Sequence, residues 1–231
     1  MRLTRDLVAR VPPYDGPHLE MGEGLPKADD QDHDATLARL MATRPDDGEV
    51  WLFAYGSLIW NPNFAHDAET VATVHGWHRA FCLGWMRSFR GSPDRPGLMM
   101  ALNRGGSCKG IGFRLPPGRV KDNLMPILRR ELPFKTSGMQ ARWLRGHTAA
   151  GPRWMIGFPI HHAAQAHVTD QSEADIVAML ATSAGPQGTM AEYLHNTVSH
   201  LEDRGIRDSY LWRLQDQLAR RIEAAAHGAI C

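Results

Sequence analysis

The chain of 231 residues is 43% hydrophobic and 22% charged, which is ordinary for a globular protein long enough to bury a substantial core. Its 26 Lys and Arg residues balance 25 Asp and Glu residues, and this near neutrality argues against a nucleic-acid partner. No apolar run approaches the roughly 18 residues that a membrane span needs, and no apolar core of a signal peptide follows Met1. Three cysteines without a CxxC pair fit a reducing, cytoplasmic location: Cys82, Cys108 and Cys231.

Residues 1–48 form an acidic extension interrupted by proline and glycine, and we expect it to be mostly irregular. One short helix is predicted near residues 34–43, where Leu37, Leu40 and Met41 share a face. The aspartates before it lack the central glycine and the terminal glutamate of a calcium loop, so they indicate a solvated helix start.

Residues 51–115 have a β pattern, with glycine and proline between several apolar runs. The first run ends in Tyr55-Gly56-Ser57-Leu58. This sequence is either a structural turn after a core strand or a nest of backbone N–H groups that binds an anion. The basic connector at residues 87–93 either closes over an acidic small molecule or is a surface loop. The predicted strands are 51–55, 71–77, 79–85, 98–102 and 110–115.

A helix is predicted over residues 120–132, with Pro126 producing either a kink or a restart of the helix. Glu131 follows two arginines, which is typical of a solvated helix end. It also falls three and four residues after Leu128 and Ile127, on the apolar side of the helix. The pattern therefore leaves both a solvated and a functional interpretation of Glu131 open.

The C-terminal part alternates strands and helices. Ser172 and Thr189 are predicted helix caps, and Leu211, Leu214 and Leu218 begin the apolar stripe of the last helix. The predicted strands are 140–147, 153–160 and 166–169, and the predicted helices end near residues 181, 204 and 226.

Twelve histidines require metal sites to be considered. Glu192-x-x-His195 has the spacing of a di-iron helix, but the second motif and the further glutamates are missing. The other histidine groups lack Cys or carboxylate partners at zinc spacing: His161, His162 and His167, and His75 with His78. We therefore predict no metal site.

Several stretches, in this order over roughly residues 50–215, resemble the ChaC-type γ-glutamylcyclotransferases. They are Tyr55-Gly-Ser-Leu-Ile-Trp-Asn-Pro62, Gly76-Trp-His-Arg-Ala-Phe81, Ser88-Phe-Arg-Gly-Ser-Pro93 with Pro96-Gly-Leu98, Cys108-Lys-Gly-Ile-Gly-Phe-Arg-Leu115, Leu128-Arg-Arg-Glu-Leu132 and Glu192-Tyr-Leu194.

The resemblance implies a mixed α+β fold, with a barrel-like, mostly antiparallel sheet and surrounding helices, in one catalytic domain over residues 49–231. It implies cyclisation of the γ-glutamyl group of glutathione to 5-oxoproline with release of Cys-Gly, without metal or organic cofactor. The expected partner is this small molecule, with no nucleic acid and no membrane, and the oligomeric state is left open.

By the same resemblance, Glu131 is the catalytic acid/base and Tyr193 lines the pocket. The turn formed by Tyr55, Gly56, Ser57 and Leu58 would hold the α-carboxylate or γ-carbonyl of the substrate. Arg90 would pair with a substrate carboxylate.

The chain departs from the family pattern after Glu131, where residues 132–139 replace a Gly-x-Tyr sequence and carry an extra proline. Because this loop flanks the leaving-group side, a cyclotransferase for another γ-glutamyl amine or amino acid is the alternative. A ligand-binding protein on the same fold that has lost catalysis is a separate alternative, and the retention of Glu131 argues against it.

Overall fold

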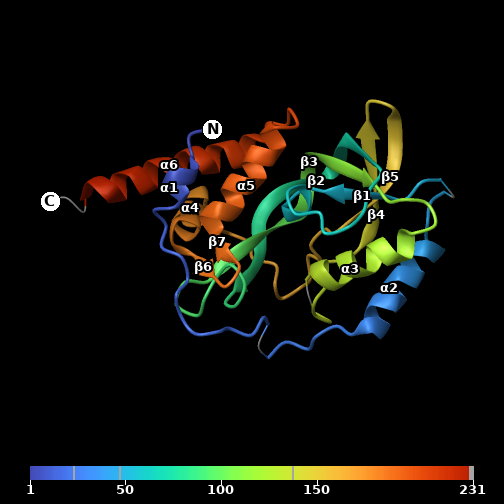
Figure 1. Cartoon of the computed structure of the whole chain (residues 1–231), viewed down its shortest axis with the longest axis horizontal. Helices are drawn as coiled ribbons and strands as arrows, with labels where there is room; N and C mark the ends of the chain where they lie inside the picture. The colour runs from blue at the N-terminus through green and yellow to red at the C-terminus, as the bar shows by residue number, and fades with distance from the viewer. Residues whose placement is uncertain (23, 47, 137, 229–231) are drawn as a thin grey trace. The chain divides into compact units, whose positions relative to one another are not determined.

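Figure 1 shows the computed structural model of the chain, which describes residues 1–22, 24–46, 48–136 and 138–228. The chain forms two compact units. The first comprises Met1–Glu23, Phe81–Met100 and Val168–Cys231, and the second Gly24–Ala80 and Ala101–His167. The predicted boundary near residue 48 and the single domain over residues 49–231 stay predictions.

The sheet is a closed barrel with the strand order β1-β3-β2-β4-β5, and most of its residues belong to the second unit. Strand β1 pairs antiparallel with β3 and parallel with β5, and β4 pairs antiparallel with β2 and β5. These pairings confirm the predicted mixed fold with a barrel-like, mostly antiparallel sheet. The strands are β1 (Trp51–Ala54), β2 (Ala68–Met86), β3 (Gly97–Arg114), β4 (Arg142–Thr148) and β5 (Gly151–Gly157).

Apolar side chains from all five strands fill the barrel. All four residues of β1 are buried, and Phe53 contributes to a core that includes Leu102, Leu144 and Met155. Strand β1 lies so close to β3 that a Cβ atom added at Gly110 would come within 2.4 Å of the Ala54 carbonyl oxygen. Glycine at this position is therefore a packing requirement.

Two predictions about the strands are wrong. The runs predicted as two strands each form single long strands, β2 and β3, because Gly76, Gly105 and Gly106 adopt φ angles of 80°, 97° and 66° without ending them. The strand predicted at residues 166–169 is reduced to one bridge residue, His167. An alternating apolar pattern cannot show whether a partner strand is present.

Two helices of the second unit pack side by side, α2 (Asp30–Ala42) and α3 (Val120–Glu131), as Figure 1 shows. Helix α2 begins earlier than predicted, because Asp29 and Asp32 form a reciprocal capping box. The aspartates therefore start a helix, as expected. Helix α3 continues through Pro126 without interruption.

Helices dominate the first unit. Ser172 and Thr189 cap their helices as predicted, and the stripe beginning at Leu211 is buried. A short N-terminal helix was not predicted; the preceding N–H of Leu3 donates a 2.9 Å hydrogen bond to Gln215, a contact far away in sequence. The elements are α1 (Arg5–Val8), α4 (Glu173–Thr182), α5 (Met190–Glu202), α6 (Ser209–Gly228), and the short strands β6 (Ala184–Gly185) and β7 (Gly188–Thr189).

Two remaining expectations concern membranes and cysteines. Within the described ranges, no helix has both the length and the apolar character needed to cross a membrane. Cys82 and Cys108 are buried and take part in no disulfide, whereas Cys231 lies outside the described residues.

The Ser172→Ala substitution is expected to lower the free energy of unfolding by about 1 kcal/mol, because it removes the side-chain cap of α4. Urea denaturation of the variant measures this loss. Ser209→Ala is the matched control, since Ser209 is exposed and Asp208, not Ser209, accepts the hydrogen bond from the Leu211 N–H. Equal stability of the two variants would contradict the capping role.

Candidate active site

The end of β1 is held by buried polar contacts. Arg79, which is 2% exposed, donates hydrogen bonds to the carbonyl oxygens of Tyr55 (2.7 Å) and Lys109 (2.8 Å). The Tyr55 hydroxyl donates to the carbonyl oxygen of Phe158 at 2.9 Å. Tyr55 therefore anchors the turn that follows, and its own side chain is buried.

Directly after Gly56 the chain forms a 3₁₀ turn, η1 (Ser57–Ile59). Its own hydrogen bonds begin with the Ile59 N–H, which donates to the Gly56 carbonyl at 2.9 Å. The N–H groups of Ser57 and Leu58 precede these bonds, as at the start of any helical turn. Leu58 is 4% exposed, and its side chain packs into the interior. This geometry favours the interpretation of the turn as a set of N–H donors.

Glu131 is the last residue of α3. Its side chain is only 15% exposed, which argues against a solvated helix end. Burial raises the pKa of this carboxyl from 4.5 to about 7, and the opposing effect of the nearby Arg130 charge is smaller. A carboxyl with a pKa near neutrality can both accept and return a proton at physiological pH.

Arg130 connects Glu131 with the turn. Its Nη2 donates to Ser57 Oγ at 2.9 Å, and its Nη1 donates to the Asn61 carbonyl at 2.6 Å. Its Nε lies 3.4 Å from Glu131 Oε1. Through Arg130, the structure thus links Ser57 and Glu131, which are 74 positions apart in the sequence. Arg130 was not among the predicted site residues. The only sequence feature that could have pointed to a role in the site is its position directly before Glu131.

Arg90 and Tyr193 lie in the first unit, where they contact each other. The Arg90 guanidinium lies 5.5 Å from the centroid of the Tyr193 ring. Its Nη1 donates to the Thr189 carbonyl (3.0 Å) and to Glu192 Oε2 (3.1 Å). Glu192, considered above as part of an iron motif, is thus an ion-pair partner of Arg90. The roles predicted for Arg90 and Tyr193 in substrate binding stay predictions.

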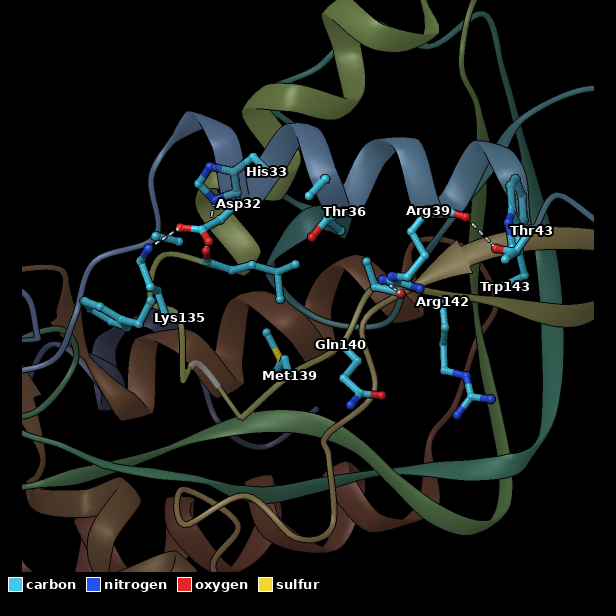
Figure 2. A pocket seen from close by; sticks show the side chains of 15 residues that line it. Asp32, His33, Thr36, Arg39, Thr43, Lys135, Met139, Gln140, Arg142 and Trp143 are labelled. Carbon is cyan, nitrogen blue, oxygen red and sulfur yellow. Dashed lines mark hydrogen bonds and ion pairs between the residues drawn. The ribbon is translucent and has the colours of Figure 1, made fainter.

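A pocket of about 800 Å³ lies in the second unit between α2 and residues 132–143 (Figure 2). None of the predicted site residues lines it, but Leu132 follows Glu131 directly, and Met139 contacts the Tyr55 hydroxyl through its sulfur at 3.8 Å. The His33 ring bonds to the Leu132 carbonyl through Nε2 at 3.0 Å. Part of the segment that departs from the family pattern thus forms a pocket wall; its residue Ser137 lies outside the described residues.

Metal ligands do not gather in the described part of the chain, where no group of three or more His, Cys, Asp or Glu side chains could hold an ion. Two histidine pairs stack edge to face there, His75 with His147 and His162 with His167. Among the described residues, neither pair belongs to a group of three side chains that could hold a metal ion.

Comparison with known proteins is consistent with this geometry. A glutathione-specific γ-glutamylcyclotransferase of Escherichia coli (strain K12) is 35% identical, over 77% of this chain and 76% of the relative. γ-Glutamylcyclotransferase 2-1 of Arabidopsis thaliana is 25% identical, over 75% of this chain and 84% of that protein.

A crystal structure of a γ-glutamyl cyclotransferase specific to glutathione from yeast has the same fold, with a TM-score of 0.66 and 18% identity over 75% of this chain and 97% of that one. Residues 50–221 match the family described as ChaC-like protein. With most of the described barrel and helices inside that match, the chain belongs to the ChaC-like family.

Proposed function

We propose that the protein is a γ-glutamylcyclotransferase that converts the γ-glutamyl group of glutathione to 5-oxoproline and releases Cys-Gly. The observation that carries this proposal is the mostly shielded Glu131 carboxyl, whose pKa of about 7 suits an acid/base and which Arg130 links to the turn that begins at Ser57. The substrate is supported by the name of the Escherichia coli relative, which is glutathione-specific.

Glu131 performs the proton transfers. The α-ammonium group of the substrate cannot attack until it loses a proton, and the Glu131 carboxylate accepts it. The neutral amine then attacks the γ-carbonyl carbon and closes a five-membered ring. As the carbon–nitrogen bond to cysteine breaks, Glu131 returns its proton to the leaving nitrogen. The ring nitrogen loses a second proton to solvent and the released amine gains one, so no water is consumed.

The turn after β1 stabilises the charge that develops on the γ-carbonyl oxygen. Backbone N–H groups of Ser57 and Leu58, together with the Ser57 hydroxyl, are the donors that the turn supplies. Holding the flexible glutamyl chain in a folded conformer lowers the barrier further, because ring closure is an intramolecular reaction.

A different γ-glutamyl substrate is the second candidate. The segment after Glu131 lacks the family's Gly-x-Tyr sequence and forms a wall of the pocket in Figure 2, which carries the cationic side chains of Arg39, Lys135 and Arg142. A protein that only binds its ligand is disfavoured, because ligand binding alone does not require an acid/base such as Glu131, whose side chain is 15% exposed.

The proposed location is the reducing cytoplasm, supported by Cys82 and Cys108, which are buried and take part in no disulfide. The proposed partner is the small-molecule substrate without nucleic acid, consistent with the formal net charge of +1.

The test is product analysis with purified protein and reduced glutathione. We expect 5-oxoproline and Cys-Gly in equal amounts and no free glutamate, because cyclisation excludes water from the cleavage. Glutamate as the product would indicate a hydrolase and contradict the proposal. Activity only on another γ-glutamyl compound would retain the reaction and reject glutathione. If no γ-glutamyl compound is cyclised, the enzyme proposal fails, and a ligand-binding protein without catalysis is the remaining alternative.

A further inference from the structure

We propose that Arg130 is a positioning residue of this site, which holds the Ser57 turn and the Glu131 carboxyl in a fixed relation and makes Ser57 a hydrogen-bond donor to the substrate. The proposal rests on the proposed function. It concerns a side chain for which the sequence suggested no role beyond its proximity to Glu131.

The geometry is that of a clamp. One planar guanidinium donates to Ser57 Oγ at the start of the turn (2.9 Å) and to the carbonyl of Asn61, two residues after its end (2.6 Å). Its third nitrogen, Nε, lies 3.4 Å from Glu131 Oε1. The guanidinium presents its donors in a rigid fork, so fixing two of its nitrogens also fixes the third. The Arg130 side chain is 25% exposed, which leaves it mostly shielded from solvent.

The clamp also determines what the Ser57 hydroxyl can do. A guanidinium only donates, so Ser57 Oγ acts as the acceptor in their hydrogen bond. The hydroxyl hydrogen is then left for another acceptor, and no residue of the described ranges accepts it. An oxygen of the substrate that gains negative charge is a suitable acceptor.

The positive charge of Arg130 acts on Glu131 as well. A cation at this distance favours the carboxylate, the form that accepts the proton. This effect opposes burial, which favours the neutral acid, and the balance leaves the pKa of Glu131 at about 7. Without Arg130, burial alone would raise the pKa further.

Arg129 provides a matched control. It precedes Arg130 in the same helix turn, but its Nη2 pairs with Asp30 Oδ1 at 2.9 Å, and its side chain is 50% exposed. Its charge is not among the causes of the Glu131 pKa shift. Loss of one exposed ion pair has little effect on stability.

The experiment measures kcat/KM for glutathione between pH 5.5 and 8.5 in wild type, Arg130→Gln, Arg130→Lys and Arg129→Gln. For Arg130→Gln we expect the acidic limb to move up by about 1 pH unit and the plateau to fall about tenfold. Arg130→Lys should restore the acidic limb but not the plateau, because an ammonium group keeps the charge and loses the fork. Arg129→Gln should match the wild type.

A purely structural role would lower activity in Arg130→Gln without moving the acidic limb, and that outcome would overturn the proposal. A wild-type profile in Arg130→Gln would do the same. If Arg130→Gln did not fold, Arg130→Lys would serve as the test. A plateau of kcat/KM in Arg130→Lys equal to that of the wild type would then contradict the positioning role of Arg130.

A substrate-free measurement separates this proposal from the proposed function. The pKa of Glu131 follows from the pH dependence of the stability difference between each protein and its Glu131→Gln variant. If the wild type cyclises no γ-glutamyl compound, the proposed function fails, while an upward shift of this pKa in Arg130→Gln still supports the contact with Glu131. An unchanged pKa would refute it.

Discussion

Replacing Glu131 by Gln is expected to lower kcat/KM for glutathione by about 10²- to 10⁴-fold, the range in which general acid–base catalysis contributes. The amide keeps the shape of the carboxyl but cannot accept the proton of the α-ammonium group. The assay is 5-oxoproline release at pH 7.5, and circular dichroism checks that the fold is retained.

Two further variants define the result. Glu131→Asp keeps the carboxyl but moves it back by one methylene. Because proton transfer depends on the position of the carboxyl, we expect activity between those of the wild type and Glu131→Gln. Glu173→Gln, on the exposed side of α4 where Glu173 pairs with Arg213, should retain wild-type activity. Equal activity of wild type and Glu131→Gln would retain the reaction and remove Glu131 from the acid/base role.

Glu131→Gln is also expected to make the protein more stable at neutral and alkaline pH. The folded pKa of Glu131, about 7, lies above its ordinary value of 4.5. Between these values the unfolded chain binds fewer protons than the folded protein, so wild-type stability falls as the pH rises through this window. This pKa shift corresponds to a loss of about 3 kcal/mol in the free energy of unfolding of the wild type as the pH rises through the window. The Gln variant, which stays neutral, does not undergo this loss.

Urea denaturation at pH 4.5, 6.0 and 7.5 tests this expectation, because the stability difference between variant and wild type should grow across the series. Glu173→Gln is the control. Arg213 lowers the pKa of Glu173, so this carboxylate stays ionised in both states above pH 5.5, and its stability difference should be flat there. A flat difference for Glu131→Gln as well would show that its carboxyl is not desolvated.

Local signals in the sequence predicted much of the secondary structure. Ser172 and Thr189 act as helix caps because a side-chain oxygen can satisfy an unpaired N–H only a few residues away. The buried strand β1 likewise follows from its aromatic and apolar composition. These interactions involve neighbours in the chain, so composition and spacing are sufficient to indicate them.

Long-range pairing was the part that local patterns missed. Glycines inside β2 and β3 suggested turns, but the strands continue through them, because pairing with neighbouring strands outweighs the local preference. The strand predicted around residues 166–169 failed for the converse reason, since only His167 there forms a β-bridge.

For the candidate site, local sequence patterns indicated the residue types: an acid beside Ile127 and Leu128 on α3, and a glycine–serine turn after a core strand. The packing of the folded chain leaves the Glu131 side chain only 15% exposed, raises its pKa to about 7, and places Arg130 between Glu131 and Ser57. Helical periodicity can place Glu131 on a face of α3, but it cannot show what covers that face. Desolvation and charge proximity depend on elements that are distant in the chain and meet only when the barrel closes.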